Sequence, residues 1–407
     1  MLFLAKRFYS RHNTLKRSAT KPAILVATGG IALGLAAMLL SICVLLGFKR
    51  ELTKKITGFA AHIEVLNTST LQIPDGFPIQ LPPYIEDKIS NLNDVTHLQK
   101  VSQKMGVLKT GVHFKPIQLK GIDEKYDTTY ISDAVVEGRL PLLSSDSATN
   151  EIVVSRKIAD ALQLTVGQRI YAYFFEDNIK MRRMHIVGIY ETNLKQFDET
   201  MILTDRNTVN KLNGWSKNQY SELEIKLTSF DNLEEKRSEI RKILAGFHRI
   251  NAITVTEHYP HVFSWLNILN TNLWVILVLM AGVAVFTLSS GLLIIMLERT
   301  PAIGMLKAMG ATDGQLRSTF IHLAMLITAK GVFWGNAVAL SFLILQHHFH
   351  FIQLDPEHYY VTEVHVELNW GIIFIINIIT ITLIFISLFA PTVIISKIAP
   401  ATSIKFD

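Results

Sequence analysis

The sequence predicts a membrane protein with four transmembrane α-helices and a large α+β extracytoplasmic domain inserted between helices 1 and 2. The 407 residues are 49% hydrophobic and only 18% charged, whereas soluble domains usually carry about 25% charge. This deficit is concentrated in four uncharged or nearly uncharged runs, each long enough to supply the roughly 20 apolar residues that span a bilayer. A long segment of mixed composition, with strand and helix signals, separates the first two runs.

Helix 1 is predicted at residues 22–48. Its apolar run from Ala23 to Phe48 exceeds the roughly 7–15 residues of a signal-peptide core, so we expect a retained anchor. Residues 1–21 combine apolar side chains with basic ones and carry no acid. We expect them to form a short amphipathic cytoplasmic helix on the inner leaflet, with a frayed basic tail as the alternative.

Residues 49–261 form the predicted extracytoplasmic α+β domain, which the resemblance described below makes periplasmic. Short runs such as EIVVS (151–155) and QRIYAYFF (168–175) predict strands, and DNLEEKRSEIRKILAG (231–246) predicts an amphipathic helix. Strand signals on both sides of that helix predict a compact strand–helix–strand unit. A segment of this size can bury a hydrophobic core of its own.

Helix 2 and its periplasmic extension are predicted at residues 262–297. An uncharged helix of this length reaches about 54 Å, against a hydrocarbon core of about 30 Å. Asparagines are concentrated in its first part, which we therefore expect outside the membrane. Helix 2, and helix 1 beyond Phe48, are expected to continue out of the bilayer as stiff rods.

The rest of the chain completes the predicted topology. It comprises a cytoplasmic segment at 298–317, helix 3 at 318–346, a periplasmic loop at 347–369, helix 4 at 370–396 and a cytoplasmic tail at 397–407. Lys and Arg lie before helix 1, in the cytoplasmic segment and in the tail, whereas the periplasmic loop has neither. This distribution places both termini in the cytoplasm. The net charge of +6 then reflects topology and anionic lipid, not nucleic acid.

The cytoplasmic segment ERTPAIGMLKAMGATDGQLRSTF (298–320) predicts a short helix between two turns. Thr300 is a suitable N-cap with Pro301 in the first turn, and Gly310 suits the position after the helix end. Thr312 and Gln315 fit a capping box that starts helix 3. One edge of the short helix is apolar, and we expect neither the bilayer nor the domain to cover it. The residues favour neither of two covers for this edge, a groove on a cytoplasmic partner or the lipid interface.

Four stretches resemble a known family. The pattern at Glu298–Thr312 resembles the coupling-helix signature of FtsX-like ABC transporter permeases. Residues 29–65, 355–370 and 396–406 resemble lipoprotein-releasing (Lol-type) transmembrane subunits, which carry a MacB-like periplasmic core domain. Ala60 and Ala61 depart from this pattern, because Gly and Ser are expected there.

The resemblance implies a permease subunit that extracts lipoproteins from the outer leaflet of the bacterial inner membrane and passes them to a periplasmic carrier. A soluble ABC ATPase would bind ATP and Mg, since this chain has no phosphate-binding G-x-x-x-x-G-K-[ST] motif. A second permease chain, identical or different, is implied as well. The alternatives are a MacB-like efflux permease and an FtsX-like signalling subunit that controls a cell-wall hydrolase. The ATPase contact is expected at Glu298, Arg299, Ile303, Gly304, Leu306, Lys307, Ala308 and Gly310.

A few further residues stand out in the predicted membrane helices. Gly30 and Gly34 form a G-x-x-x-G step that suits close packing, either within the chain or with a second permease chain, and we favour the second. Lys330 lies inside helix 3, where it either extends toward the cytoplasm or serves gating or cargo. The histidines at 347–350 fit no metal-site spacing and no catalytic arrangement occurs, so we expect no catalytic or metal site and no cofactor bound by this chain.

Overall fold

The computed structural model describes residues 20–71, 77–111, 113–144, 147–175 and 178–388. The predicted N-terminal helix, the C-terminal tail and the last residues of helix 4 lie outside this part of the chain. The fold divides into two compact units. We call residues 1–49, 265–353 and 363–407 the helical unit, and residues 50–264 and 354–362 the sheet unit.

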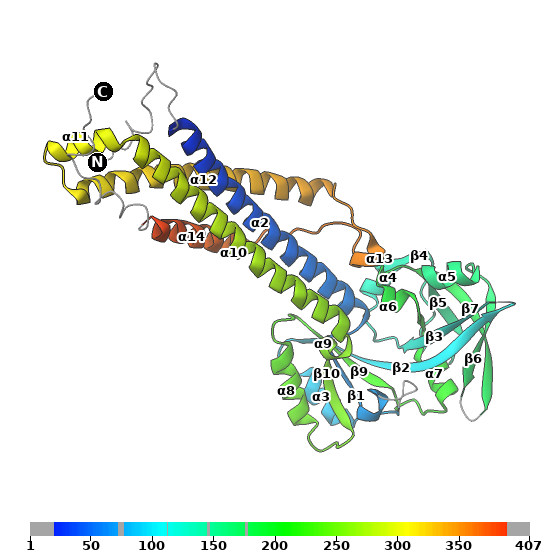
Figure 1. Cartoon of the computed structure of the whole chain (residues 1–407). Helices are drawn as coiled ribbons and strands as arrows, with labels where there is room; N and C mark the ends of the chain where they lie inside the picture. The colour runs from blue at the N-terminus through cyan, green and yellow to red at the C-terminus, as the bar shows by residue number, and fades with distance from the viewer. Residues whose placement is uncertain (1–19, 72–76, 112, 145–146, 176–177, 389–407) are drawn as a thin grey trace. The chain divides into compact units, whose positions relative to one another are not determined.

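Four described helices are long and apolar enough to cross a membrane (Figure 1). They are α2 (Thr20–Phe59), α10 (Pro260–Glu298), α12 (Asp313–Phe349) and α14 (Trp370–Ser387). The expectation that helices 1 and 2 continue unbroken is confirmed, since α2 and α10 have 40 and 39 residues. The short helix α11 (Thr300–Ala308) lies between α10 and α12.

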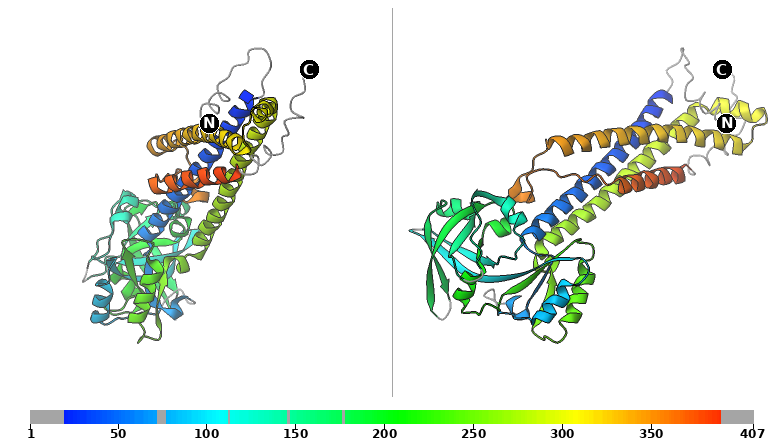
Figure 2. Two further views of the ribbon diagram at one scale, coloured as in Figure 1. Left: turned by 90° about the vertical axis from the view of Figure 1, so that its left-hand side faces the viewer. Right: turned by 180° about the vertical axis from the view of Figure 1, so that it is seen from behind.

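The helical unit is held together by apolar contacts among α2, α10, α12 and α14. Figure 2 shows the ribbons of these four helices from two sides. One buried cluster combines residues of all four helices, including Ile31, Leu288 and Phe320. A second joins α2, α12 and α14 around Leu39 and Leu343. An interhelical pair of amides adds to this packing, because Asn336 and Asn377 donate hydrogen bonds to each other at 2.7 and 3.0 Å. Such polar contacts are a regular means of joining helices in lipid.

Glycines bring the helix backbones close together. A Cβ atom added at Gly30 would lie 2.5 Å from Thr287 of α10, and one at Gly34 would lie 3.1 Å from the carbonyl oxygen of Met280. Of the two interpretations of this G-x-x-x-G step, packing within the chain is therefore what the structure shows at these positions. Gly331 of α12 likewise packs against Ile31 of α2.

Gly47 makes the tightest backbone approach of α2. A Cβ atom there would meet the carbonyl oxygen of His365 at 2.4 Å and the amide nitrogen of Glu367 at 2.8 Å. That backbone is itself fixed, because the Glu367 amide donates to the Cys43 carbonyl at 3.1 Å. Only glycine fits this approach without a shift of one chain segment.

We expect Gly47→Ala to destabilise the protein by about 1–3 kcal/mol, the usual cost of overpacking a closely packed site. The matched control is Gly282→Ala in α10, where an added Cβ has no atom of the described chain within 4 Å. Thermal unfolding in detergent measures both variants. Equal melting temperatures for the two alanine variants would contradict this account of the packing.

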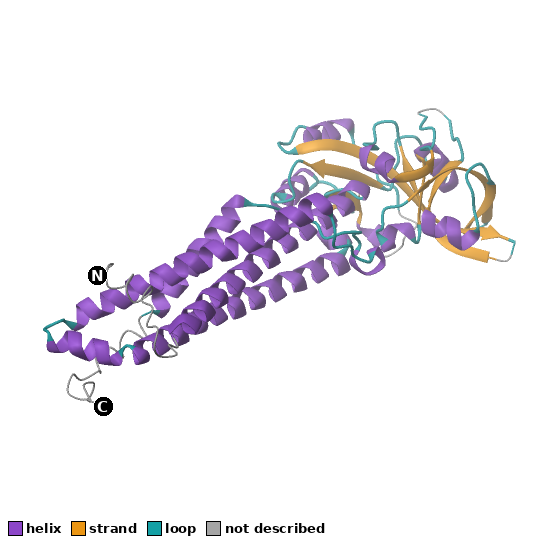
Figure 3. Cartoon of the chain, turned by 90° about the horizontal axis from the view of Figure 1, so that it is seen from above, coloured by secondary structure: helices purple, strands orange, loops and turns teal. Residues whose placement is uncertain are grey.

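All the described strands lie in the sheet unit (Figure 3). They form a 10-stranded sheet with the order β10-β1-β9-β2-β3-β8-β5-β7-β4, and β6 pairs with both β2 and β7. The strands are β1 (Ile63–Asn67), β2 (Val95–Thr110), β3 (His113–Ile122), β4 (Val135–Gly138), β5 (Glu151–Ser155), β6 (Arg169–Phe175), β7 (Ile179–Tyr190), β8 (Met201–Asp205), β9 (Glu222–Leu227) and β10 (Ile250–Thr254).

The pairing of β6 with two strands closes part of the sheet into a barrel made of β2, β3, β8, β5, β7 and β6. The first half of β2 pairs with β9, and its second half pairs with β3 and β6. This double role explains why β2 has 16 residues. The barrel encloses an apolar core that includes Ile117, Phe174 and Ile202.

Short helices accompany the sheet. They are α3 (Pro83–Ser90), α4 (Thr129–Ala134), α5 (Arg156–Leu162), α6 (Lys195–Asp198), α7 (Arg206–Asn213), α8 (Leu233–Ile243), α9 (Val255–His258) and α13 (Pro356–Tyr359). The predicted strand–helix–strand unit is present as β9, α8 and β10, but β1 lies between the two strands and pairs antiparallel with both. The fold is therefore the predicted one, four long apolar helices with an α+β domain between the first and the second.

Candidate functional site

The segment between α10 and α12 is the candidate functional site. Its α11 begins one residue away from the sequence-based expectation: the N-cap position belongs to Arg299, without a side-chain cap, and not to Thr300. The Thr300 hydroxyl instead donates to the Met296 carbonyl at 3.2 Å. It thereby satisfies a carbonyl at the end of α10, which would otherwise lack a partner there. Pro301 lies in the first turn as predicted.

The second turn follows the predicted chemistry. Gly310 has φ of +95°, the left-handed region that glycine adopts without strain. Thr312 and Gln315 form the predicted capping box at the start of α12, with both reciprocal hydrogen bonds present. The Lys307 ammonium lies 2.9 Å from the Asp313 carboxylate and links α11 to the first residue of α12. The turn is thus fixed by a glycine, a cap and an ion pair.

The apolar edge of α11 faces into the helical unit. Ile303 is fully buried and Gly304 is buried, while Leu306 is half-buried. Ile303 belongs to the same cluster as Met296, Leu316 and Phe320. The expectation that a cytoplasmic partner or the lipid interface covers this edge is therefore wrong for Ile303, because α10 and α12 of the same chain cover it. The helical period places apolar residues on one edge, but it does not say what covers that edge.

The outer face of α11 carries two methionines. The exposed fraction is 61% for Met305 and 79% for Met309, and Ala308 and Gly310 are exposed beside them. Glu298 and Arg299 are half-buried at the end of α10. Exposed methionine is a flexible, polarisable side chain that suits a protein contact surface. The sequence-based reading missed Met305 altogether as a candidate contact residue.

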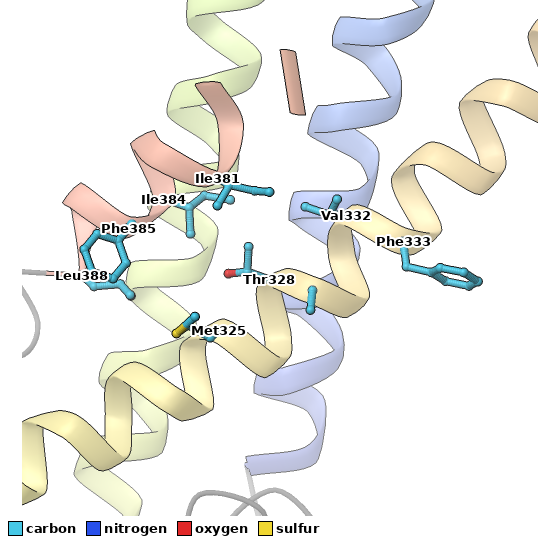
Figure 4. A pocket seen from close by; sticks show the side chains of 9 residues that line it. Met325, Thr328, Val332, Phe333, Ile381, Ile384, Phe385 and Leu388 are labelled. Atoms are coloured by element: carbon cyan, nitrogen blue, oxygen red, sulfur yellow. The ribbon is translucent and has the colours of Figure 1, made fainter. Parts of the chain in front are cut away.

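Two apolar grooves lie along the membrane helices. One has a volume of about 520 Å³ between α12 and α14, and Figure 4 shows its lining residues. Thr328 points from α12 toward Ile384 of α14, and its hydroxyl is buried without a hydrogen-bond partner among the described residues. The other groove has a volume of about 450 Å³ between α2 and α10 and is lined in part by Val26 and Phe286.

The remaining predicted residues lie apart from these features. Lys330 is exposed on α12 and does not line either groove. His350 and His365 both lie near the Glu363 carboxylate, at 3.1 and 3.5 Å. In the described ranges no group of three or more His, Cys, Asp or Glu side chains is placed to hold a metal ion.

Comparison with known proteins identifies the family of the chain. The MacB-like periplasmic core domain family matches residues 24–243, and the FtsX-like permease C-terminal family matches residues 274–400. The chain belongs to the FtsX-like permeases with a MacB-like periplasmic core domain. The permease is therefore a multi-pass membrane protein whose sheet unit is the periplasmic domain. Members of this ABC permease family are typically non-catalytic transmembrane subunits.

The permease is also similar to curated proteins over most of its length. The lipoprotein-releasing system transmembrane protein LolC of Xylella fastidiosa is 19% identical and covers 93% of this chain and 92% of its own. LolC of Neisseria meningitidis is 21% identical and covers 94% of both chains. LolE of Haemophilus influenzae is 19% identical and covers 91% of both.

Two solved structures resemble part of the permease at low similarity. The extracellular domain of the noncanonic ABC-type transporter YknZ from Gram-positive bacteria is 16% identical, with a TM-score of 0.34, and covers 47% of this chain and 99% of its own. The periplasmic region of MacB from Actinobacillus actinomycetemcomitans is 16% identical, with a TM-score of 0.34, and covers 51% and 95%.

Proposed function

We propose that this permease is a subunit of an ABC transporter that extracts lipoproteins from the outer leaflet of the bacterial inner membrane and passes them to a periplasmic carrier. The observation that carries the proposal is the extent of its likeness to LolC and LolE, which covers more than nine-tenths of the chain. Both the membrane helices and the periplasmic domain are included in that likeness.

Energy is supplied by a separate soluble ATPase that binds ATP and Mg. The proposed topology puts both termini and α11 in the cytoplasm, in agreement with the placement of Lys and Arg. The ATPase docks on the outer face of α11, at Met305, Ala308 and Met309, with Glu298, Arg299 and Gly310 at the margins. Ile303, Gly304 and Leu306 act from the other side: they seat α11 on α10 and α12. Lys307 holds the turn through Asp313.

The physical cost of moving a lipid anchor favours a lateral path through the membrane. At about 0.8 kcal/mol per buried methylene, exposing three 16-carbon chains to water costs on the order of 35–40 kcal/mol. Contacts on a soluble domain would not offset this cost. We therefore propose that the acyl chains enter an apolar cleft lined by α2 and α10. Exposed apolar side chains on these two helices support this assignment, among them Leu33, Val278 and Phe286.

A second permease chain, identical or different, completes the cleft. The α2–α10 groove is open on one side of a single chain, and four helices do not enclose a lipid anchor. Closure of the paired ATPases would displace α11, and the rigid helices α10 and α2 would carry this displacement to the periplasmic domain.

Lys330 contributes to gating or extends toward the lipid headgroups.

The second candidate function is that of a MacB-like efflux permease or an FtsX-like subunit that signals to a cell-wall hydrolase. The match of residues 24–243 to the MacB-like periplasmic core domain supports this second candidate function. In this case the same motion of the periplasmic domain would act on an exit duct or a hydrolase, and no lipid-modified protein would accompany the permease.

Purification of the full chain from its native membranes in mild detergent, followed by mass spectrometry, separates the two functions. We expect an ABC ATPase and lipid-modified protein in the complex. An ATPase without any lipid-modified protein, with or without nucleotide, would contradict lipoprotein extraction and favour the second function. The absence of any ATPase would contradict both.

A further inference from the structure

A cluster of charged side chains lies in the periplasmic domain where α2 ends and α10 begins. Four of them are buried, Glu64 on β1, Lys120 on β3, and Glu222 and Glu224 on β9, and His258 on α9 is partly buried. Glu64 lies directly opposite Glu224 in the pairing of β1 with β9. Like charges in such cross-strand positions are destabilising unless they are compensated.

Lys120 compensates one carboxylate and also contacts the end of α2. Its Nζ atom lies 2.6 Å from Oε1 of Glu224 and donates to the carbonyl oxygen of Phe59 at 2.7 Å. Phe59 is the last residue of α2, where the carbonyl groups lack helical partners and a positive charge is favourable. The Phe59 ring lies 5.6 Å below the same ammonium group. Lys120 thus caps α2 on the sheet.

His258 compensates a second carboxylate and lies next to the start of α10. Its Nδ1 atom is hydrogen-bonded to Oε2 of Glu64, and its ring stacks on Tyr259 at 4.6 Å. Tyr259 directly precedes Pro260, the first residue of α10. The amide of Val255 in the same short helix donates to the carbonyl of His62 next to β1, at 3.0 Å. The start of α10 is thereby linked to the same strand pair as the end of α2.

The neighbouring charges favour the protonated forms of both cations in the cluster. Burial opposes the charged form of Lys120, but Glu224 and its neighbours raise the pKa of Lys120 well above its ordinary value. The charge of Glu64 is the main cause that raises the pKa of His258 to about 9. Burial, then the charges of Glu64 and Glu224, raises the pKa of Glu222 to about 8. At neutral pH Glu222 is therefore largely uncharged, whereas Lys120 and His258 carry a positive charge.

Stability alone is a weak reason for such a cluster. Buried ion pairs can often be replaced by apolar residues without loss of stability, whereas removal of one partner is costly. The charges instead fix the positions of the helix ends. Lys120 joins Glu224 to the end of α2, and His258 joins Glu64 to the start of α10. Apolar packing would not by itself restrain the Phe59 carbonyl.

We propose that Lys120–Glu224 and His258–Glu64 form a rigid joint that fixes the end of α2 and the start of α10 on the sheet of the periplasmic domain. Lys120 and His258 are its positioning residues. Displacement of either helix is then transmitted to the domain and is not absorbed by a hinge. This inference rests on the proposed function for its purpose, but the joint itself can be tested without nucleotide or ATPase.

The test measures distance distributions by pulsed electron paramagnetic resonance in the full chain, with Cys43→Ala as background. One pair of spin labels is placed at the exposed positions Lys54 on α2 and Lys88 on α3, and another at His261 on α10 and Lys242 on α8. All four positions belong to the sheet unit. The unsubstituted joint should give narrow distributions for both pairs.

Lys120→Met leaves Glu224 buried and unpaired, so it lowers the melting temperature. The double variant K120M/E224Q removes the unpaired charge and recovers melting temperature, yet the hydrogen bond to the Phe59 carbonyl stays lost. In both variants we expect the Lys54–Lys88 distribution to broaden at least about twofold, because a released helix end samples further local states. His258→Gln, at a side chain that is 31% exposed, should broaden the His261–Lys242 distribution in the same way.

The matched control is K226M/D127N. Lys226 pairs with Asp127 at 2.9 Å in the same domain and also lies over the Tyr126 ring, as Lys120 does. No contact of this pair reaches Phe59 or His258 among the contacts of the described residues. We expect the distance distributions of both spin-label pairs to stay narrow in this control variant.

Unchanged widths in folded K120M/E224Q and H258Q would overturn the joint. If the widths broaden but wild-type chain never co-purifies with an ATPase, the joint stands and the proposed function fails. If an ATPase does co-purify, K120M/E224Q should still bind it and hydrolyse ATP while nucleotide no longer moves the periplasmic domain. A merely structural role would not separate hydrolysis from movement.

Discussion

The double variant M305E/M309E should lose its complex with the ABC ATPase, with affinity reduced at least about 30-fold, the effect of losing a contact worth about 2 kcal/mol. Both side chains project from the outer face of α11, at 61% and 79% exposure. Docking would remove water from two carboxylates without providing them with partners, which is costly. Titration of the purified ATPase onto immobilised permease measures the loss.

M305L/M309L is the matched control, since leucine keeps the apolar volume and should preserve binding. Neither pair of substitutions touches the buried cluster around Ile303, so surface replacement should change the stability of the permease by no more than about 0.5 kcal/mol. Equal affinity of the glutamate and leucine variants for the ATPase would show that the outer face of α11 is not the docking surface.

The second large effect is a fall in the stability of the periplasmic domain as pH rises from about 6.5 to about 9. The pKa of His258 is raised to about 9, mainly by Glu64, so its stabilising contribution is complete below the unfolded pKa near 6.5 and is lost as pH rises through about 9. The pKa of Glu222 is raised to about 8, mainly by burial. The folded state therefore also holds this proton longer, and stability falls in the same direction.

We expect this loss to be of order 2 kcal/mol, after allowance for the partial exposure of His258, at about 1.4 kcal/mol per pKa unit. Denaturant unfolding of the full chain between pH 6.5 and 9.5 measures it. His62 makes stability rise with pH, but only below this range, because burial lowers its pKa to about 4. H258Q should flatten the profile and H97Q, at an exposed histidine, should not. A profile that rises with pH would contradict the charge assignment.

Local chemistry made part of the fold predictable. The capping box of Thr312 and Gln315 and the positive φ of Gly310 each depend on one or two side chains, and both are present as expected. Strand β5 coincides with the predicted EIVVS run, because this pattern is short and uninterrupted. The length of its uncharged run was enough to predict that α10 is longer than a membrane span, and α2 continues past Phe48 as expected.

The features that the sequence did not predict depend on which segments of the chain pack against one another. The strand signals of β2 and β3 were missed because polar residues such as Gln99, Lys104 and Lys120 are buried in them, which hides the alternation of a half-buried strand. The same burial concealed the joint, since a pattern of charges is ordinarily read as a solvated face. On α11, periodicity predicts the apolar edge but not the surface that covers it, so it does not reveal that Ile303 is buried and Met305 is exposed.

The central claim is that an ATPase docked on α11 moves the periplasmic domain. The most direct measurement compares label distances between α11 and that domain, with and without nucleotide, in the intact permease–ATPase complex. We expect a nucleotide-dependent change that disappears in K307E/G310V, because the new glutamate repels Asp313 and valine is strained at a position with φ of +95°. A nucleotide-dependent change of the same size in this variant would contradict it.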